Sequence, residues 1–260
     1  MSGADLHIHS TSSDGTLSPE EIVEIAEEKG LGAISITDHD SISGIQRAID
    51  FSQRKSIEVV PGIEFSTEYA DSEVHMLGYY FDYLDPSLNR FLKKLRDSRM
   101  RRAEKIVAKL NDIGYRLDFY EISRSIEPDK SIGRPHIARA MVRRGYCSSI
   151  EDAFERFLSA GRPAYVERFK LSPFAALEMI RAANGVSSIA HPGLIVNIDT
   201  LKLIKKLKEW GLSGIEVYHS RHSQSDIDHF LSAAHEPNLI PTGGSDCHGD
   251  LVDGEPRLGN

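Results

Sequence analysis

The chain has 260 residues, of which 40% are hydrophobic and 27% are charged. These values exclude a fibrous or low-complexity protein and suit one α/β barrel, or a core domain with an insertion. No apolar run approaches the length of a membrane span, and Met1-Ser2-Gly3-Ala4 lacks a basic flank, so we expect no membrane segment and no signal peptide. The distant Cys147 and Cys247 are interpreted as ordinary thiols, which fits a cytoplasmic location.

Charge is distributed unevenly along the chain. Residues 87–170 contain 20 Lys and Arg against 11 Asp and Glu, a net charge of +9, whereas the rest of the chain has a net charge of −17. A solvated helix surface accounts for many single arginines, but less easily for the change of sign. The pattern indicates cations bound by the acidic part and an anionic substrate met by the basic part.

The first part of the chain alternates between strand and helix patterns. In a strand over residues 5–10, side chains alternate between faces, so His7 and His9 share one face, with Asp14 close behind. Ser18-Pro19-Glu20-Glu21 is a helix start, and Gly30 ends that helix. Further elements are expected as a strand at 32–37, a helix at 42–55, a strand at 57–60 that turns at Pro61-Gly62, and a strand at 74–80. This alternation predicts a parallel sheet or barrel.

The alternation stops near Asp85-Pro86. Helical spacing then covers residues 88–113, 134–145 and 150–159, with few strand-like runs between them. The first of these helices has a basic face formed by Arg90, Lys93, Lys94, Arg96, Arg99, Arg101, Arg102 and Lys105. We therefore predict an all-helical insertion at 86–170, between barrel segments 1–85 and 171–260.

After residue 170 the alternation resumes. Helices are expected at 172–184, 201–210 and 225–235, and strands at 186–190, 214–218 and 239–242, followed by the turn 243–249. His222, His229 and His235 are interpreted as solvent-facing helix residues.

Histidines and carboxylates follow the predicted strand ends. His39, Glu64, His191, Asp246 and His248 each come at or just after such an end, and His75 lies within its strand. In a parallel β/α barrel these ends meet at the face where active sites form, so we expect the side chains to converge with His7, His9 and Asp14. Imidazole and carboxylate ligands without thiolates suit Mn²⁺, Fe²⁺ or Zn²⁺. Nine candidate ligands are enough for two or three ions, with a carboxylate such as Glu64 as a bridge, and such clusters activate water and clamp a phosphoryl group.

The ordered motifs Asp-Leu-His-Ile-His-Ser, Thr-Asp-His-Asp, Gly-Ile-Glu, Ala-His-Pro-Gly and Gly-Ser-Asp-Cys-His-Gly resemble those of the polymerase and histidinol phosphatase (PHP) domain family. The resemblance implies a distorted seven-stranded β/α barrel with a trinuclear site, and of the suitable metals we expect Mn²⁺. It implies one metal held by His7, His9, Glu64 and Asp246, a second by Glu64, His75 and His191, and a third by Asp14, His39 and His248. Many members have His where this chain has Asp14. Asp14, His39, Glu64 and Asp246 are the expected catalytic residues.

The insertion resembles the cap of PHP phosphoesterases that act on nucleotides, through Gly133-Arg134-Pro135-His136 and Gly161-Arg162-Pro163. Arg134 offers a planar fork to a phosphate and His136 a further donor. Arg162 is a further expected substrate contact, and His219, which follows a strand end, is expected to reach the phosphate from behind the metals.

The expected function is metal-dependent hydrolysis of phosphate esters of nucleotides, by a water molecule that the metals activate. The resemblance implies conversion of nucleoside 3′,5′-bisphosphates to 5′-monophosphates, or 5′-3′ trimming of short RNA, with no obligate protein partner. One alternative is a phosphatase for a small substrate of the histidinol phosphate type, although such a substrate needs no basic insertion. Another is a non-catalytic metal-binding or nucleic-acid-binding module, although such variants usually lack ligands.

Overall fold

The computed structural model describes residues 3–124, 129–235, 238–249, 251–252 and 255–259. Met1 and Ser2, which the signal-peptide argument used, lie outside the described residues. By its internal contacts the chain divides into two compact units, residues 1–89 with 170–260 and residues 90–169. No helix among the described residues is long and apolar enough to cross a membrane.

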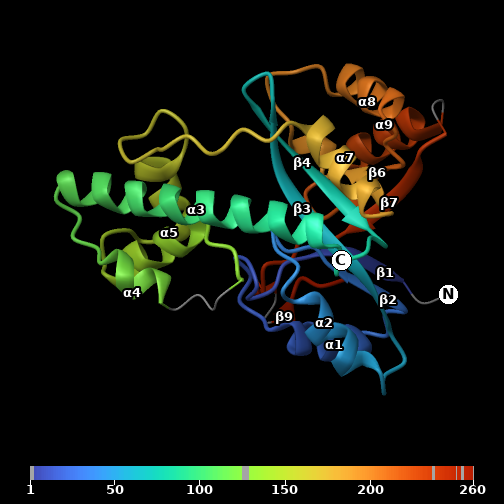
Figure 1. Cartoon of the computed structure of the whole chain (residues 1–260), viewed down its shortest axis with the longest axis horizontal. Coiled ribbons are helices and arrows are strands. Elements are labelled where there is room, and N and C mark those ends of the chain that lie inside the picture. The colour runs from blue at the N-terminus through green and yellow to red at the C-terminus, as the bar shows by residue number, and fades with distance from the viewer. Residues whose placement is uncertain (1–2, 125–128, 236–237, 250, 253–254, 260) are drawn as a thin grey trace. The chain divides into compact units, whose positions relative to one another are not determined.

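The first unit is an α/β barrel of seven strands (Figure 1). Its strands are β1 (Ala4–Ile8), β2 (Ala33–Ile36), β3 (Glu58–Tyr69), β4 (Ser72–Tyr79), β5 (Val186–Ile189), β6 (Gly214–His219) and β7 (Ile240–Gly244), hydrogen-bonded in that order. The backbone N–H of Asp246 donates to His7 O at 2.8 Å and that of His9 donates to Cys247 O at 2.9 Å. These bonds join the end of β7 to β1, so the seven-stranded barrel is nearly closed and the expected α/β architecture is confirmed.

Helices connect the strands of this unit. They are α1 (Pro19–Glu28), α2 (Ile45–Ser52), α7 (Pro173–Ala182), α8 (Thr200–Glu209), α9 (Gln224–His235) and the short 3-10 helix η2 (Pro192–Leu194). In Figure 1, α1 and α2 lie beside β1 and β2, whereas α7, α8 and α9 lie on the opposite side of the barrel. Ser18 and Glu21 form the predicted capping box of α1. The apolar stripe of α1 packs against β1 and β2 in a core that contains Ile8, Ile22 and Ile34. A small pair, β8 (Leu251–Val252) and β9 (Glu255–Pro256), follows the barrel.

The expectation of an all-parallel sheet was wrong at β4. This strand pairs antiparallel with β3 and with β5, whereas the other adjacent pairs are parallel. Only Ala70 and Asp71, both with positive φ, separate β3 from β4, and a parallel connection needs a much longer crossover. The start of β4 therefore lies at the end of the barrel where the parallel strands finish, and His75 reaches that end from the opposite direction.

The strand predicted at 57–60 does not turn at Pro61-Gly62 but runs from Glu58 to Tyr69, so Glu64 lies inside β3 rather than after its end. Pro61 has no N–H to donate, but its carbonyl accepts the N–H of Tyr80 at 3.1 Å and stays within the sheet. A Cβ on Gly62 would lie 2.0 Å from Ser35 Oγ. Gly62 therefore permits close packing of β3 on β2 rather than a turn.

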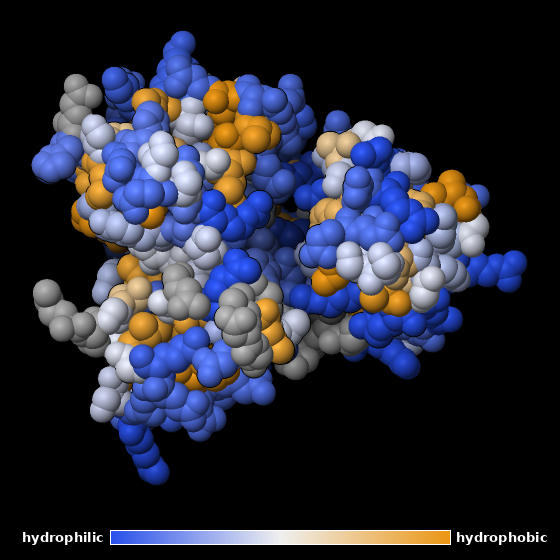
Figure 2. All heavy atoms as spheres, turned by 180° about the vertical axis from the view of Figure 1, so that it is seen from behind, coloured by the Kyte–Doolittle hydropathy of each residue, from blue (hydrophilic) through white to orange (hydrophobic). Residues whose placement is uncertain are grey.

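The second unit is helical in its described residues. Its elements are α3 (Pro86–Asp112), which begins in the first unit, α4 (Phe119–Ser123), α5 (Arg134–Arg143), α6 (Ile150–Ala153) and the π-helix η1 (Phe154–Leu158). They enclose a separate apolar core that includes Ile106, Leu110, Ile137, Met141 and Leu158. On the face seen in Figure 2 most of this unit's surface is hydrophilic, with apolar side chains confined to small patches.

Candidate metal centre

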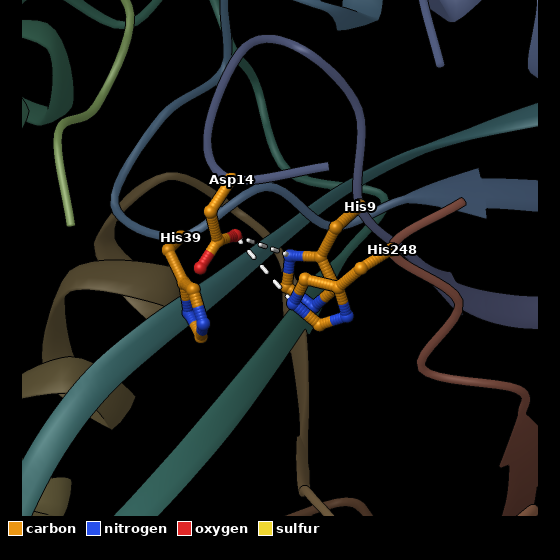
Figure 3. Close-up of side chains that lie close together, drawn as sticks. All are labelled: His9, Asp14, His39 and His248. Carbon is orange, nitrogen blue, oxygen red and sulfur yellow. Dashed lines mark ion pairs between the residues drawn. The ribbon is translucent and has the colours of Figure 1, made fainter. Parts of the chain in front are cut away.

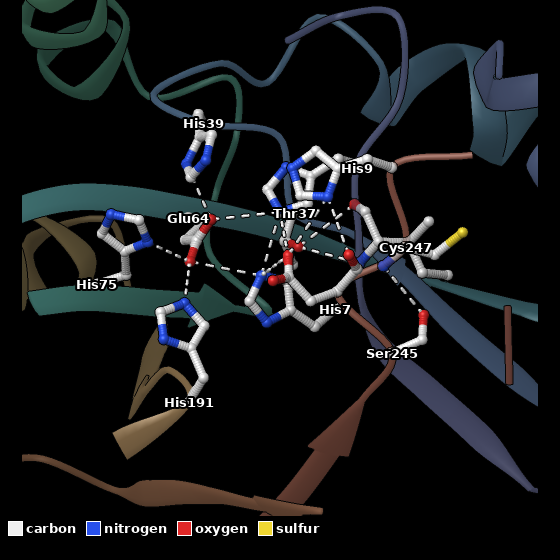
Figure 4. A network of polar contacts seen from close by, with 12 residues as sticks. His7, His9, Thr37, His39, Glu64, His75, His191, Ser245 and Cys247 are labelled. Carbon is white, nitrogen blue, oxygen red and sulfur yellow. Dashed lines mark hydrogen bonds and ion pairs between the residues drawn. The ribbon is translucent and has the colours of Figure 1, made fainter. Parts of the chain in front are cut away.

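Glu64 lies at the centre of a group of histidines at one end of the barrel (Figure 4). Its side chain is almost completely buried, and Oε1 lies 2.8 Å from His75 Nδ1 and 3.2 Å from His191 Nε2. Oε2 lies 2.8 Å from His39 Nδ1 and 3.3 Å from His9 Nε2. A single carboxylate therefore contacts imidazoles from four separate segments of the chain.

His7 and His9 share one face of β1, as the alternation of a strand requires. Their Nε2 atoms lie 3.2 Å apart, and each lies close to Asp246 Oδ1, at 3.4 Å from His7 and 3.1 Å from His9. Both rings are fully buried. The three residues form one of the groups among the described residues whose ligand atoms could hold a metal ion.

A second such group contains Asp14, His9, His39 and His248 (Figure 3). Asp14 Oδ1 lies 3.8 Å from His9 Nδ1 and 3.5 Å from His248 Nε2. The third group contains His39, Glu64 and His75. The three groups contain eight of the nine side chains expected from the sequence, with His9 and His39 shared between groups, and the ninth, His191, contacts Glu64.

Buried polar atoms support a metal rather than a purely hydrogen-bonded cluster. Glu64 Oε2 and His191 Nδ1 have no hydrogen-bond partner of acceptable geometry, although Glu64 Oε2 has imidazole nitrogens nearby. The carboxylate oxygen is thus buried among imidazoles without a hydrogen bond to satisfy it. Uncompensated burial of such atoms is costly, and a cation bound there removes the cost. The residues therefore fit a divalent metal centre.

The histidines and carboxylates of this cluster shift one another's pKa values towards the charged forms. Burial opposes the charged form of His9 and His75, yet the neighbouring carboxylates outweigh it and raise the pKa of His9 to about 10 and that of His75 to about 9. Burial would raise the pKa of Asp14, Glu64 and Asp246, but the surrounding histidines hold each of them well below its usual value. The protons on these imidazole nitrogens occupy the positions at which a metal ion would bind, so protons and metal ions compete for the same atoms.

Glu216 was not predicted from the sequence, and it orients two of the nine residues. It lies in β6 and is completely buried, and its Oε1 is 2.9 Å from His7 Nδ1. Its Oε2 accepts the backbone N–H of His191 at 2.6 Å. A proton on His7 Nδ1 that is donated to this carboxylate leaves Nε2 with a lone pair directed at the cluster. The available signal was an acidic residue within the otherwise apolar strand run Gly214-Ile215-Glu216-Val217.

The backbone of His191 is strained, with φ 27° and ψ 58°. Such a conformation in a non-glycine residue costs on the order of 1–3 kcal/mol and persists where its surroundings fix it. The short bond from His191 N to Glu216 is one such constraint. It aims the ring of His191 back at Glu64.

Two more buried carboxylates, Asp38 and Asp5, shape the loops of the centre. Asp38 accepts the backbone N–H of Ser10 at 2.8 Å and the hydroxyls of Ser10 and Ser13 at 2.6 Å each, which fixes the loop that carries Asp14. Asp5 accepts the backbone N–H of Ser245 at 2.9 Å, in the loop that carries Asp246. Asp38 stands within the Thr-Asp-His-Asp motif, but the sequence does not indicate whether it fixes a loop by hydrogen bonds or binds a metal ion.

His219, expected to reach a phosphate from behind the metals, has a completely buried side chain. Its Nε2 lies 3.5 Å from Asp246 Oδ2. The interpretation of His222 as a solvent-facing helix residue was wrong. His222 precedes α9 and is half-buried; its Nδ1 lies 2.9 Å from Val217 O, and its Nε2 accepts the N–H of Gly193 at 3.1 Å. His229 and His235 are exposed on α9 as expected.

In the helical unit, Arg134 and Arg162 line different hollows. Arg134 lines one with Arg99 and Arg102, and Arg162 lines another beside Phe154 and Glu155. His136 is the third residue of α5, and its Nδ1 accepts the N–H of Gly133 at 3.1 Å, so this nitrogen caps the helix.

Arg99, Arg102 and Arg134 form the arginine cluster of this unit. Each guanidinium donates to a backbone carbonyl: Arg102 to Val166 O at 2.8 Å, Arg134 to Leu158 O at 3.3 Å and Arg99 to Ile132 O at 3.5 Å. Burial, together with the charges of Arg134 and Arg99, lowers the pKa of Arg102 to about 10. A half-buried concentration of positive charge of this kind favours a bound anion.

Comparison with known proteins places these features in a family. The model of the PHP domain matches residues 5–180. The chain is 33% identical over 250 residues to a 3′,5′-nucleoside bisphosphate phosphatase of Chromobacterium violaceum, covering 95% of this chain and 88% of that protein. It is 34% identical over 247 residues to a 5′-3′ exoribonuclease of Haemophilus influenzae, covering 94% and 89%. A solved structure from Bifidobacterium adolescentis, of a protein proposed to be a metal-dependent phosphoesterase, superposes with a TM-score of 0.90 at 28% identity, covering 98% of this chain and 92% of that one.

Proposed function

Because the chain belongs to the PHP domain family, we propose that it is a metal-dependent phosphoesterase that hydrolyses phosphate esters of nucleotides. The observation that carries the proposal is the convergence of nine imidazole and carboxylate side chains on Glu64 and its neighbours at one end of the barrel. Two relatives named for nucleotide and RNA substrates support the substrate class.

We assign His7, His9, Glu64, His75, His191, Asp246, Asp14, His39 and His248 as the metal ligands. The donor set of imidazoles and carboxylates suits two or three ions of Mn²⁺, Fe²⁺ or Zn²⁺, of which Mn²⁺ is our first choice. Bound divalent ions lower the pKa of water and neutralise phosphoryl oxygens. Asp14, His39, Glu64 and Asp246 are the residues we assign to catalysis, through their contact with these ions.

The reaction adds one water molecule across the ester. The oxygen of water bonds to phosphorus, the ester P–O bond breaks, and the leaving oxygen takes up a proton, so the products are an alcohol and a phosphate. For a nucleoside 3′,5′-bisphosphate these products are the 5′-monophosphate and inorganic phosphate. In RNA trimming the ester is the internucleotide bond, and a nucleoside 5′-monophosphate is released.

The arginine cluster supports a nucleotide over a small monophosphate. We propose that the helical insertion acts as a substrate-binding cap and that Arg134, with Arg99 and Arg102, binds a phosphate group of the nucleotide that is not hydrolysed. Guanidinium groups held by backbone carbonyls are pre-organised for such bidentate recognition. His136, Arg162 and His219 remain proposed contributors to substrate binding, His219 through Asp246 rather than by direct contact.

A panel of substrates tests the proposal. The full chain is loaded with Mn²⁺ and assayed for release of phosphate or nucleotide from adenosine 3′,5′-bisphosphate, a short 5′-phosphorylated RNA, histidinol phosphate and p-nitrophenyl phosphate. We expect the highest kcat/KM on one of the first two, and loss of activity after chelation. Highest activity on histidinol phosphate would favour the small-molecule alternative. Metal binding without hydrolysis of any ester would favour the non-catalytic module.

A further inference from the structure

The hollow beside the metal centre is lined mainly by metal-ligand candidates and other acidic groups. It has a volume of ≈ 270 Å³, enough for a phosphoryl group and part of the group esterified to it. Its lining includes Glu64, Glu73, Asp246, His75 and His191. The three carboxylates in this lining, Glu64, Glu73 and Asp246, each disfavour an anion. A positive side chain in the lining is therefore informative.

Arg221 is the only Lys or Arg among the described residues that line this hollow. Its side chain is exposed, and it forms no hydrogen bond or ion pair with any described residue. Surface arginines commonly pair with a nearby carboxylate, yet this one, beside an acidic site, does not. Its five N–H donors are available to a ligand.

The backbone under Arg221 is held firmly. Arg221 N–H donates to His219 Nδ1 at 3.1 Å, and His222 N–H donates to His219 O at 2.9 Å. Ser220 Oγ donates to Ser245 O at 2.8 Å, which ties the turn to the segment that leads into Asp246. The turn therefore fixes the Cα of Arg221 next to the metal centre, while its guanidinium pairs with none of the residues that the structure describes.

We propose that Arg221 binds the phosphoryl group that is hydrolysed, an inference that rests on the proposed function and deepens it. Arg221 differs in role from the arginine cluster of the helical unit, which we assign to a phosphate that is retained. A guanidinium donates two parallel hydrogen bonds to a phosphoryl group, and these strengthen as negative charge develops on its oxygens during attack. The contact is independent of the alcohol portion of the ester, so it serves every substrate.

The variants Arg221→Ala and Arg221→Lys test this assignment in the full chain, with Arg54→Ala as the matched control. Arg54 is an exposed arginine of the same unit that does not line the hollow. The measurements are metal content by elemental analysis, thermal unfolding, binding of inorganic phosphate by calorimetry to the Mn²⁺-loaded protein, and kcat/KM on adenosine 3′,5′-bisphosphate and p-nitrophenyl phosphate.

For Arg221→Ala we expect kcat/KM to fall by about 10- to 100-fold on both substrates, and phosphate binding to weaken, with metal content and unfolding temperature unchanged. Arg221→Lys keeps the positive charge but not the planar guanidinium with its two parallel donors. We therefore expect its kcat/KM to lie between those of Arg221→Ala and the unaltered protein. A change of less than twofold on both substrates overturns the assignment, as does loss confined to the bisphosphate or loss of metal. If the unaltered protein hydrolyses none of the four esters of the substrate panel, the proposed function fails, while weakened binding of inorganic phosphate in Arg221→Ala still supports the contact.

Discussion

The two units of this chain use different chemistry for what we propose are two parts of one task. The barrel gathers imidazoles and carboxylates around Glu64, with each of the two Glu64 oxygens contacting more than one histidine. The helical unit gathers Arg99, Arg102 and Arg134, each of which donates a hydrogen bond to a backbone carbonyl. The first set suits cations and the second suits anions. The difference teaches that the change in charge sign along the sequence coincides with two distinct clusters of side chains, one acidic and imidazole-rich and one of arginines.

The largest effect expected is that of Glu64→Gln, which removes the charge at the centre of the barrel site. A neutral amide cannot balance the histidines around it or bridge two ions, so kcat/KM should fall by roughly a thousandfold or more, with loss of bound metal. Elemental analysis and phosphate release measure both effects. Glu58→Gln, an exposed position at the start of the same strand, is the control. Asp14→Ala should reduce metal content less than Glu64→Gln, because Asp14 lies close to two of the histidines, His9 and His248, whereas Glu64 lies close to four. Full metal content in Glu64→Gln would contradict the central role of this carboxylate.

Glu216→Gln should have the next largest effect, because a glutamine has one oxygen for the two donors that Glu216 accepts. Either His7 loses its partner at Nδ1 or His191 loses the bond that holds its strained backbone. We expect metal affinity to weaken by about 10- to 100-fold, measured by competition with a chelator. Glu216→Asp keeps both oxygens on a shorter side chain and should be affected less. Unchanged affinity in Glu216→Gln would show that the carboxylate only fills a buried space.

Arg134→Ala tests the other side of the comparison. If the arginine cluster binds the retained phosphate, kcat/KM on adenosine 3′,5′-bisphosphate should fall by about 10- to 100-fold, while hydrolysis of p-nitrophenyl phosphate and metal content stay nearly constant. Arg144→Ala, at the other end of α5 and outside the cluster, is the matched control. Equal losses on both substrates would show that Arg134 supports the fold or the reacting phosphate instead.

The smallest effect expected is on the pH dependence of stability in the chelated, metal-free protein. The raised pKa values of His9 and His75 stabilise the fold fully below about pH 6.5, and this contribution disappears as pH rises through about 9 to 10. The lowered pKa values of Asp14, Glu64 and Asp246 stabilise it above about pH 4.5, and this contribution disappears in acid. His39 acts in the opposite sense, because burial lowers its pKa.

We therefore expect the unfolding temperature of the metal-free protein to be highest between about pH 4.5 and 6.5 and to decline towards pH 10. Bound metal competes with these protons, so the metal-loaded protein should gain stability over the same rise in pH. The unfolding temperatures of the metal-free and the metal-loaded protein, measured by thermal unfolding from about pH 4.5 to pH 10, test this expectation. A metal-free protein whose unfolding temperature stays constant from pH 6 to pH 10 would contradict the assigned proton positions.

The sequence alone was sufficient to single out the nine residues that we assign to the barrel site, because seven of them stand in short motifs at or near strand ends and strand periodicity is a local property. It also determined most elements, including the capped start of α1 and the helical character of residues 88–113. Local signals were misleading where packing decides the outcome. Pro61-Gly62 has the composition of a turn, yet pairing of Pro61 with Ile36 and of Gly62 with Tyr79 keeps both residues in β3.

Only the tertiary structure decided the direction of β4, the roles of Glu216, Asp38 and Asp5, and the place of Arg221. A buried carboxylate is defined by the donors that surround it, and those donors come from segments far away in the chain: Glu216 contacts residues 209 and 25 positions distant. Likewise, nothing in Ser220-Arg221-His222 distinguishes an arginine beside a metal centre from one on an ordinary surface. Local sequence thus determined which residues can bind a metal, whereas long-range packing determined which groups orient them and which charge faces the ligand.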